Sequence, residues 1–193
     1  MKLRLLLLLL CFCCLLPAAS LAGISIDNGN GTMTDTSTGL VWLKNANCTD
    51  SSGGITPPYA TSYGANYMSW YDAQTWSSGL ASGACGLRDG SHAGEWRVPT
   101  VDELKSLISG PGTPVWRCSD FNCTNYDYSR AEPASWLTSQ GFTAVQADVY
   151  WSSSTYPDYP EDAWGVSMDY GNVYNYGKSS GLLCLAGSRR TVG

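Results

Sequence analysis

The segment 94–108, GEWRVPTVDELKSLI, constrains the fold most strongly, because it fixes where one helix begins. Thr100 and Glu103 have the spacing of a capping box, in which each side chain hydrogen-bonds to the backbone N–H of the other residue. Pro99 disfavours helical geometry for the residue before it. Apolar residues then recur at helical spacing, at Val101, Leu104, Leu107 and Ile108. The sequence therefore predicts a helix that starts directly after Thr100 and follows an extended segment.

The rest of the chain reads as one more helix and several short strands. Ser69 and Asp72 precede a second predicted helix, whose apolar face carries Trp70, Ala73, Trp76 and Leu80. The turn-forming residues at 27–32 and at 169–172 predict two hairpins, the stretch 111–141 reads as loops with short elements, and 182–186 reads as a final apolar strand. This order predicts an α+β domain, with two helices packed on small twisted antiparallel sheets.

The first residues have the pattern of an export signal. Two basic residues precede an apolar run over 5–16, and the small residues up to Ala22 fit a signal-peptidase site. The run is too short to span a bilayer. Its cysteines do not follow the small residue that a lipidation site requires. We therefore predict a signal peptide over 1–22 and one domain over 23–193, located in the secreted, periplasmic or cell-surface fraction.

Five cysteines remain after the predicted cut, at Cys48, Cys85, Cys118, Cys123 and Cys184. Cysteines of exported proteins are mostly oxidised, and an odd number leaves one without a partner in its own chain. The short polar loop CSDFNC predicts a bridge between Cys118 and Cys123, and Cys48 with Cys85 is the second predicted pair. Cys184 is left over, and a disulfide between chains through it would make the protein a structural module of an envelope assembly.

Composition argues against two classes of partner. The formal net charge of the chain is −5, and loss of the two basic residues of the leader makes it more negative. Nucleic acids and anionic membrane surfaces bind proteins through basic patches. We therefore expect neither as a partner, and we expect no integral membrane span after the leader.

Catalysis has little support in the sequence. His92 is the only histidine, and it lies in a loop rich in Gly and Ser. A histidine-based triad would depend on it alone, and no serine stands in a recognisable nucleophile elbow. One histidine with scattered cysteines does not make a zinc ligand set. We therefore predict that the protein is not an enzyme.

Aromatic residues point instead to binding. The chain has 8 Trp and 12 Tyr but only 3 Phe. Trp and Tyr combine a large apolar area with a polar edge, so they serve both cores and recognition surfaces. Five tryptophans fall at apolar positions of the expected elements and are predicted to be core: Trp42, Trp70, Trp76, Trp96 and Trp164.

Tyrosines near the C-terminus lie among Asp, Asn, Ser and Gly, a composition typical of antibody paratopes. We predict that 156–162 and 170–176 form one exposed patch; ordinary strand tyrosines in soluble hairpins are the alternative interpretation. The candidate ligand-binding residues are Tyr156, Asp158, Tyr159, Tyr170, Asn172, Tyr174, Asn175 and Tyr176. Asp158, Glu161 and Asp162 also offer oxygen atoms of the kind that calcium takes, although a solvated acidic loop is the simpler interpretation.

Four blocks of the sequence, in this order, resemble the Lcl C-terminal domain family, long classed as a domain of unknown function. The blocks are GTMTDTSTGLVWLKNANC, CGLRDGSHAGEWRVPTVDELKSLI, FTAVQADVYWSSST and AWGVSMDYGNVYNYGKS. The resemblance implies a C-type-lectin-like α+β fold, related to that of formylglycine-generating enzymes, and export from a bacterium. It also implies, as for the adhesin that gives the family its name, attachment to sulfated polysaccharides on host surfaces.

The chain departs from the family pattern in two places. Its final strand reads LLCLAGSRR where many relatives carry an aromatic residue and a Val-Arg pair, and its sequence has no collagen-like Gly-X-Y repeat. The trimeric architecture of the adhesin is therefore not carried over, and oligomerisation stays open. We expect an exported domain that binds carbohydrate or a surface protein. The alternative from another class is a copper oxidase of the formylglycine-generating type, which would use Cys118 and Cys123.

Overall fold

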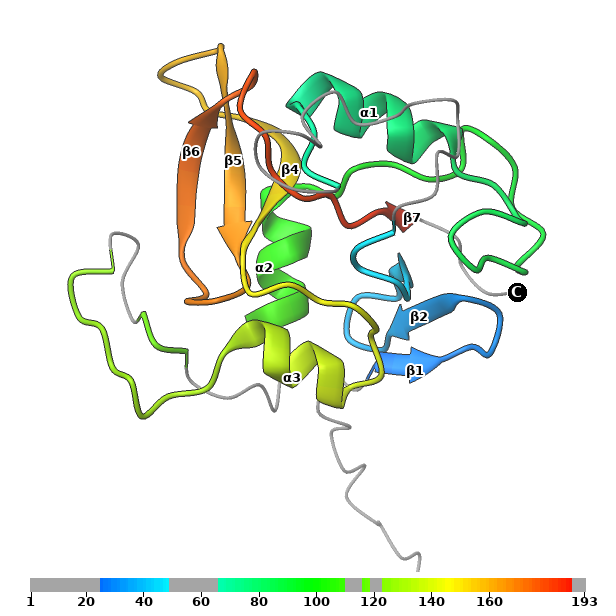
Figure 1. Ribbon diagram of the computed structural model, residues 1–193, viewed down its shortest axis with the longest axis horizontal. Coiled ribbons are helices and arrows are strands. Elements are labelled where there is room, and N and C mark those ends of the chain that lie inside the picture. The colour runs from blue at the N-terminus through cyan, green and yellow to red at the C-terminus, as the bar shows by residue number, and fades with distance from the viewer. Residues whose placement is uncertain (1–24, 49–65, 110–115, 119–122, 189–193) are drawn as a thin grey trace, which may run out of the picture.

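A computed structural model describes residues 25–48, 66–109, 116–118 and 123–188 (Figure 1). The predicted signal peptide and its cut after Ala22 lie outside the described residues. Within the described ranges, no helix is long and apolar enough to cross a membrane.

The predicted α+β class is confirmed. The described part of the chain contains three helices: α1 (Trp70–Gly79), α2 (Val101–Ser109) and α3 (Pro133–Ser139). It also contains seven strands: β1 (Ser25–Asp27), β2 (Thr32–Asp35), β3 (Val41–Leu43), β4 (Val149–Thr155), β5 (Asp162–Ser167), β6 (Val173–Gly177) and β7 (Gly187–Ser188). The finer expectation of a C-type-lectin-like arrangement stays a prediction.

The strands form two antiparallel sheets. One has the order β1-β2-β3-β7 and the other the order β4-β5-β6. Figure 1 shows the three-stranded sheet at one side of the molecule, with β6 as its outer strand, and α2 behind β4. Helix α2 packs against β4 and β5, and α1 packs against β4. The three-stranded sheet is thus held by both long helices on its β4 side, and β6 is left at the edge.

Local signals fix both long helices where the sequence predicts them. The Thr100 hydroxyl accepts a hydrogen bond from the Glu103 N–H (3.2 Å), and the Glu103 carboxylate accepts one from the Thr100 N–H (2.8 Å). At α1 the Ser69 hydroxyl accepts a hydrogen bond from the Asp72 N–H (3.2 Å). These bonds satisfy N–H groups that have no partner inside a helix. The predicted capping box is therefore confirmed.

The core is built largely from tryptophans and aliphatic residues. Trp42, Trp76 and Trp96 are at most 2% exposed, as predicted. Trp70 and Trp164 are only partly buried and pack against the core from its edge, so their prediction as core residues is correct only in part. Trp70 is the first residue of α1, and Trp164 lies in β5 on the face that carries the exposed Asn175.

Helix α3 is an element that the sequence analysis did not separate from the loops around it. It has seven residues, begins with Pro133, and has no side-chain hydrogen bond at its N-cap, Glu132. Helices this short are not stable by themselves, so the helix depends on tertiary contacts. Its buried residues are Pro133, Ala134 and Leu137, and the Ala134 N–H donates to the Met168 carbonyl (2.8 Å).

The predicted final strand is misplaced. Residues 182–183 make only isolated bridges, Met68 with Leu182 and Tyr150 with Leu183, whereas β7 follows at Gly187–Ser188. This segment runs between the two sheets. Its backbone hydrogen-bonds first to Met68, then to Val149 in β4, and then to Leu43 in β3. Its apolar side chains are buried all the same, which is why the sequence pattern resembles that of a strand.

Both predicted disulfides are present: Cys48 is bonded to Cys85 and Cys118 to Cys123. Among the described cysteines only Cys184 has no disulfide, and it is buried (5% exposed). The first bridge ties the end of the β3 segment to the loop after α1. The second closes the start of the loop that leads to α3.

Candidate functional site

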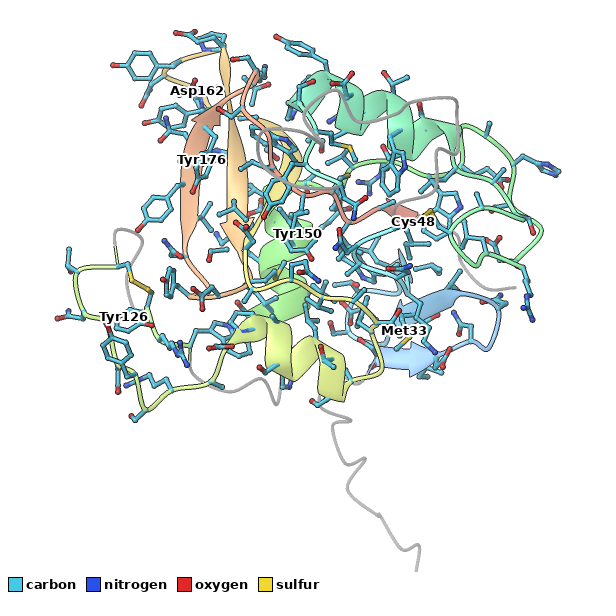
Figure 2. The ribbon with its side chains drawn as sticks, in the orientation of Figure 1. Met33, Cys48, Tyr126, Tyr150, Asp162 and Tyr176 are labelled. Carbon is cyan, nitrogen blue, oxygen red and sulfur yellow. A yellow bond between two sulfur atoms is a disulfide. The ribbon has the colours of Figure 1, made fainter. Side chains whose placement is uncertain are left out.

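The predicted ligand-binding residues all lie on or next to the three-stranded sheet, but not in one patch. Strands β5 and β6 are antiparallel, with Asp162 paired to Gly177 and Val166 to Val173. The loop 156–161 therefore lies at one end of the sheet and the turn 168–172 at the other, about 15 Å away at ~3.3 Å per residue. Figure 2 shows Asp162 and Tyr126 near these opposite ends.

The first end carries a continuous aromatic surface. The ring of Tyr156 stacks on Tyr159, with centroids 5.9 Å apart and an interplanar angle of 24°. The same ring makes a T-shaped contact with Trp164, with centroids 4.7 Å apart and an interplanar angle of 76°. Tyr159 is 57% exposed. Tyr156 is therefore the centre of a row of three rings that is open to solvent at Tyr159.

Polar groups lie beside these rings. Asn175 pairs with Trp164 across β5 and β6, and its side-chain amide donates to the Asp162 carboxylate (2.7 Å). Asn175 is exposed. We name the set Tyr156, Tyr159, Asp162, Trp164 and Asn175 the loop-end surface. It combines aromatic rings with an amide and a carboxylate, which are the groups that stack on and hydrogen-bond to polyols.

Lys178 holds the loop of this surface in place. Its ammonium donates to the Thr155 hydroxyl (2.9 Å) and to the Pro160 carbonyl (2.7 Å), and it lies 4.5 Å from the centroid of the Trp70 ring. The Lys178 N–H also donates to the Glu161 carbonyl (2.9 Å). The sequence analysis missed this role, because nothing around Lys178 distinguishes it from an ordinary surface lysine.

The acidic side chains of the loop do not form a metal site. The Asp158 carboxylate accepts a hydrogen bond from the Tyr156 hydroxyl (3.0 Å), which raises the pKa of Tyr156. Asp162 is engaged by Asn175. In the ranges that the structure describes, no three His, Cys, Asp or Glu side chains are placed to hold a metal ion. The structure therefore does not bring Asp158, Glu161 and Asp162 together as calcium ligands.

The other end of the sheet carries a second aromatic group around Tyr170. Tyr126 lies between Tyr170 and Tyr128, at centroid distances of 5.2 Å and 4.2 Å. Tyr128 is 81% exposed. Arg117 donates to the Tyr126 hydroxyl (3.2 Å) and pairs with Glu132 (2.7 Å). The sequence analysis missed Tyr126 and Tyr128, although their surroundings, NYDYS, have the same composition as the predicted patch.

Three predicted residues belong to neither exposed group. Asn172 is only 3% exposed, and neither polar atom of its side chain has a hydrogen-bond partner among the described residues. Burial keeps this side chain from a ligand at the surface. Tyr174 and Tyr176 are partly buried and point to the opposite face of β6 from Asn175, because side chains alternate along a strand.

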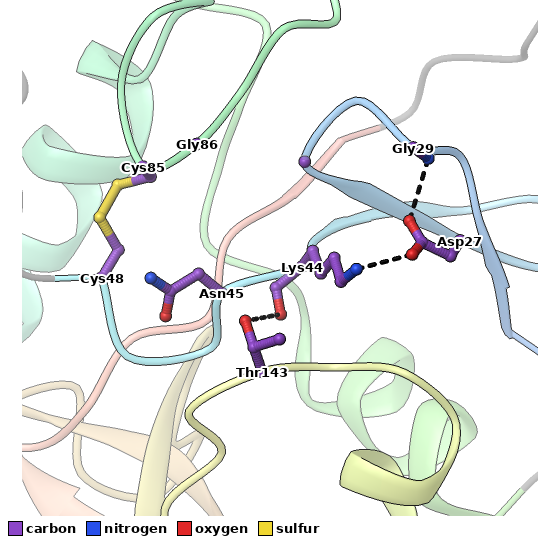
Figure 3. A pocket seen from close by; sticks show the side chains of 9 residues that line it. Asp27, Gly29, Lys44, Asn45, Cys48, Cys85, Gly86 and Thr143 are labelled. Atoms are coloured by element: carbon purple, nitrogen blue, oxygen red, sulfur yellow. Dashed lines mark hydrogen bonds and ion pairs between the residues drawn. A yellow bond between two sulfur atoms is a disulfide. The ribbon is translucent and has the colours of Figure 1, made fainter.

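Two pockets add to these surfaces. One, of about 440 Å³, lies between the β1–β2 turn, the Cys48–Cys85 disulfide and Thr143 (Figure 3). Its charged groups neutralise each other, since Lys44 pairs with Asp27 at 2.6 Å. The hydrogen bond from Lys44 holds the pKa of Asp27 below its usual value. These charges are thus already paired within the protein.

The second pocket has a volume of about 420 Å³ and lies beside Tyr176. Tyr67 and Asp148 line it, and the Tyr67 hydroxyl donates a hydrogen bond to the Asp148 carboxylate. The sequence analysis did not single out either residue. They are far apart in the chain, so no local pattern links them.

The thiols needed by the copper-oxidase alternative are not present in this structure. Cu(I) is held by thiolates in such sites, but Cys118 and Cys123 are joined in a disulfide. The pair therefore does not fit the metal. His92 is exposed in its loop, as expected for a solvated histidine.

Comparison with known proteins identifies the family. The sequence model of the Lcl C-terminal domain matches residues 31–186. No curated protein matches the chain significantly. The matched segment contains all three described helices, the three-stranded sheet and both aromatic groups. This chain therefore belongs to the Lcl C-terminal domain family.

Proposed function

We propose that this protein is an exported, non-enzymatic binding domain that recognises carbohydrate through its loop-end surface. The observation that carries the proposal is the row of rings Tyr159, Tyr156 and Trp164 beside the Asn175–Asp162 pair. A sugar ring stacked on Tyr159 would expose its hydroxyls to the amide and carboxylate. Such ring stacking with adjacent polar groups is a general way to bind a polyol without catalysis.

Charge favours a neutral glycan over a sulfated one. The loop-end surface and its loop contain Asp158, Glu161 and Asp162, whereas the nearby cation, Lys178, is engaged by the loop itself and by Trp70. Like charges repel across an interface, and the cost is greatest where solvent is excluded. The attachment to sulfated polysaccharides that the family resemblance implies is therefore not the specificity that we propose for this surface.

Export is supported by two observations of different kinds. The sequence begins with the pattern of a signal peptide, and the described part of the chain contains two disulfides. Disulfides persist in oxidising compartments outside the cytosol. The alternative of an assembly linked through Cys184 has less support, because that thiol is 5% exposed and cannot reach another chain without local opening.

A surface protein is the second candidate ligand, and the group around Tyr126 favours it. Tyr128 is exposed, and Arg117 lies next to Tyr126. Tyr and Arg are enriched where proteins bind one another. Under this alternative Tyr128→Ala abolishes attachment to host cells, and removal of glycans from those cells leaves attachment unchanged.

The first test is binding of the mature protein to arrays of neutral and sulfated glycans, with Tyr159→Ala and Asn175→Ala as variants. Tyr71→Ala is the matched control, because Tyr71 is exposed to a similar degree (60% against 57%) but lies on α1. We expect binding to neutral glycans, weakened about tenfold by either variant, which corresponds to ~1.4 kcal/mol. If both variants are folded and bind as the wild type does, the loop-end surface is not the site.

A further inference from the structure

The pocket beside Tyr176 is separate from the loop-end surface. Its lining comes from the segment before α1, the start of β4, the end of β6 and the chain that follows: Tyr67, Asp148, Val149, Tyr176, Ser180, Gly181 and Leu182. Asn175 and Tyr176 are consecutive in β6, so their side chains point to opposite faces. A ligand in this pocket therefore does not contact Asn175 from the loop-end side.

Asp148 gives the pocket a negative charge that no cation of the described residues balances through an ion pair. Its carboxylate accepts hydrogen bonds from the Tyr67 hydroxyl and from the Val149 N–H (2.7 Å). No ion pair among the described residues includes Asp148. The sequence of 49–65, which precedes Tyr67, contains no Lys, Arg or His. Two hydrogen bonds leave further acceptor positions on a carboxylate.

The remaining groups of the pocket suit a cation that carries hydroxyls. The hydrogen bond to Asp148 raises the pKa of Tyr67 to about 12, so Tyr67 stays a donor and fixes the carboxylate. The rings of Tyr67 and Tyr176 flank the pocket, and aromatic rings attract cations within about 6 Å. In the part of the chain that the structure describes, the hydroxyls of Tyr176 and Ser180 donate no hydrogen bond.

We propose that this pocket binds a small organic cation, a primary ammonium on a hydroxyl-bearing body. The ammonium would pair with Asp148, and the hydroxyls would reach Tyr176 and Ser180. A charge-assisted hydrogen bond is about twice as strong as a neutral one, so the ammonium supplies most of the selectivity. The volume of about 420 Å³ lies within the range of pockets for small ligands. An amino sugar and a simple amino alcohol both offer this chemistry.

The test compares three sugars of the same ring that differ at one carbon. Glucosamine carries an ammonium there, glucose a hydroxyl and N-acetylglucosamine a neutral amide. We expect calorimetric titration of the mature protein to show glucosamine binding at least tenfold more tightly than the other two. Ethanolamine distinguishes the two ligand types. If it binds as tightly as glucosamine, the site is assigned to simple amino alcohols. If it binds more weakly, the site is assigned to amino sugars. Equal affinity for all three sugars overturns the proposal.

Variants separate this pocket from the loop-end surface. Asp148→Asn removes the charge and keeps one of the two acceptor oxygens, and we expect at least a tenfold loss of glucosamine binding by a variant that circular dichroism shows to be folded. Tyr67→Phe, which keeps the ring, tests the contribution of the hydroxyl if Asp148→Asn fails to fold. Tyr159→Ala should leave glucosamine binding intact, so failure of the glycan proposal does not affect this one. If the folded Asp148→Asn variant binds glucosamine as tightly as the wild type, the proposal for this pocket is overturned.

Discussion

Arg97 and Glu103 form a two-pronged ion pair at the start of α2. Arg97 Nη1 donates to Glu103 Oε2 (2.8 Å), and Nη2 donates to Oε1 (2.6 Å). The backbone of Arg97 exchanges two hydrogen bonds with Gly187 in β7, each 3.0 Å long. Glu103 also caps the Thr100 N–H. One carboxylate thus connects the helix that supports the three-stranded sheet to the edge of the four-stranded sheet.

Removing the two halves of the cap should destabilise the protein to different extents. We expect Thr100→Ala to lower the free energy of unfolding by about 1 kcal/mol, the usual cost of a lost N-cap. Glu103→Ala should cost more, about 2 kcal/mol, because it also leaves Arg97 without its partner. Urea unfolding followed by tryptophan fluorescence measures both. Asp102→Ala is the control, since its side chain is 88% exposed.

Acid should weaken the same connection. Burial raises the pKa of Glu103, but hydrogen bonds from Arg97 and Thr100 outweigh it and leave the pKa below the usual 4.5. A lowered pKa in the folded state contributes stability above the unfolded value, and this is lost as pH falls through the folded value. We expect Glu103→Gln to lose less stability than the wild type between pH 5 and 3. Parallel pH profiles of the two proteins would show that Glu103 does not contribute to acid sensitivity.

The two disulfides should contribute unequally. The Cys48–Cys85 bridge spans a sequence separation of 37 residues, and the Cys118–Cys123 bridge one of 5. In the chain-entropy model these loops correspond to about 4 and about 2 kcal/mol. Double Ser variants of each pair, compared by chemical denaturation, check the order. A larger loss from the short bridge would mean that it stabilises the native loop directly.

Gly31 should tolerate no side chain. Its φ is +88°, and a Cβ there would overlap the backbone carbonyl of Gly86. Gly29, two residues earlier, has φ +71° but open space around it. We expect Gly29→Ala to cost about 1 kcal/mol, from the left-handed backbone alone. Gly31→Ala should cost at least twice as much in denaturant unfolding; equal costs would show that the turn moves away from Gly86 freely.

Cys184 should be chemically inert in the native protein. It is buried, at 5% exposed, and this burial raises the pKa of its thiol far above the usual value. The thiolate is the reactive form, so both access and ionisation oppose reaction. We expect a thiol reagent such as DTNB to label no cysteine of the mature native protein and one after unfolding in urea. Fast labelling without denaturant would place Cys184 at an accessible surface.

Lys178 should act on the glycan site through the loop that it holds. We expect Lys178→Met to speed amide hydrogen exchange in 156–161 and to weaken glycan binding several-fold, because Lys178 positions the loop that carries Tyr156 and Tyr159. Lys105→Met is the control, since that side chain is 53% exposed and lies on α2. Unchanged exchange in the loop would show that the hydrogen bonds of Lys178 do not order it.

Features that depend on neighbouring residues could be predicted from the sequence. The starts of α1 and α2 follow from caps within three residues, and the hairpin turns follow from short runs of turn formers. The local bridge follows from the spacing of Cys118 and Cys123. Each of these is decided over a few bonds, so a linear pattern contains the necessary information.

Features that depend on distant segments were missed or only partly predicted. Helix α3 has no side-chain cap, and the carbonyl of Met168, distant in the sequence, accepts a hydrogen bond from its Ala134 N–H. Asn172 has a surface-like sequence but is buried. The register of β5 and β6 separates Tyr159 from Tyr170, although composition alone had grouped them.

The sequence by itself determined the α+β class, the starts of α1 and α2, the local Cys118–Cys123 bridge and the aromatic composition of the candidate site. Only the tertiary structure decided which tyrosines meet, that Lys178 hydrogen-bonds to their loop, and that Tyr67, Asp148 and Tyr176 line one pocket. The physical reason is the sequence separation of the groups that interact. Caps and turns are satisfied by backbone groups a few residues away, whereas a binding surface is a relation between side chains brought together by the register of the strands and the packing of the helices.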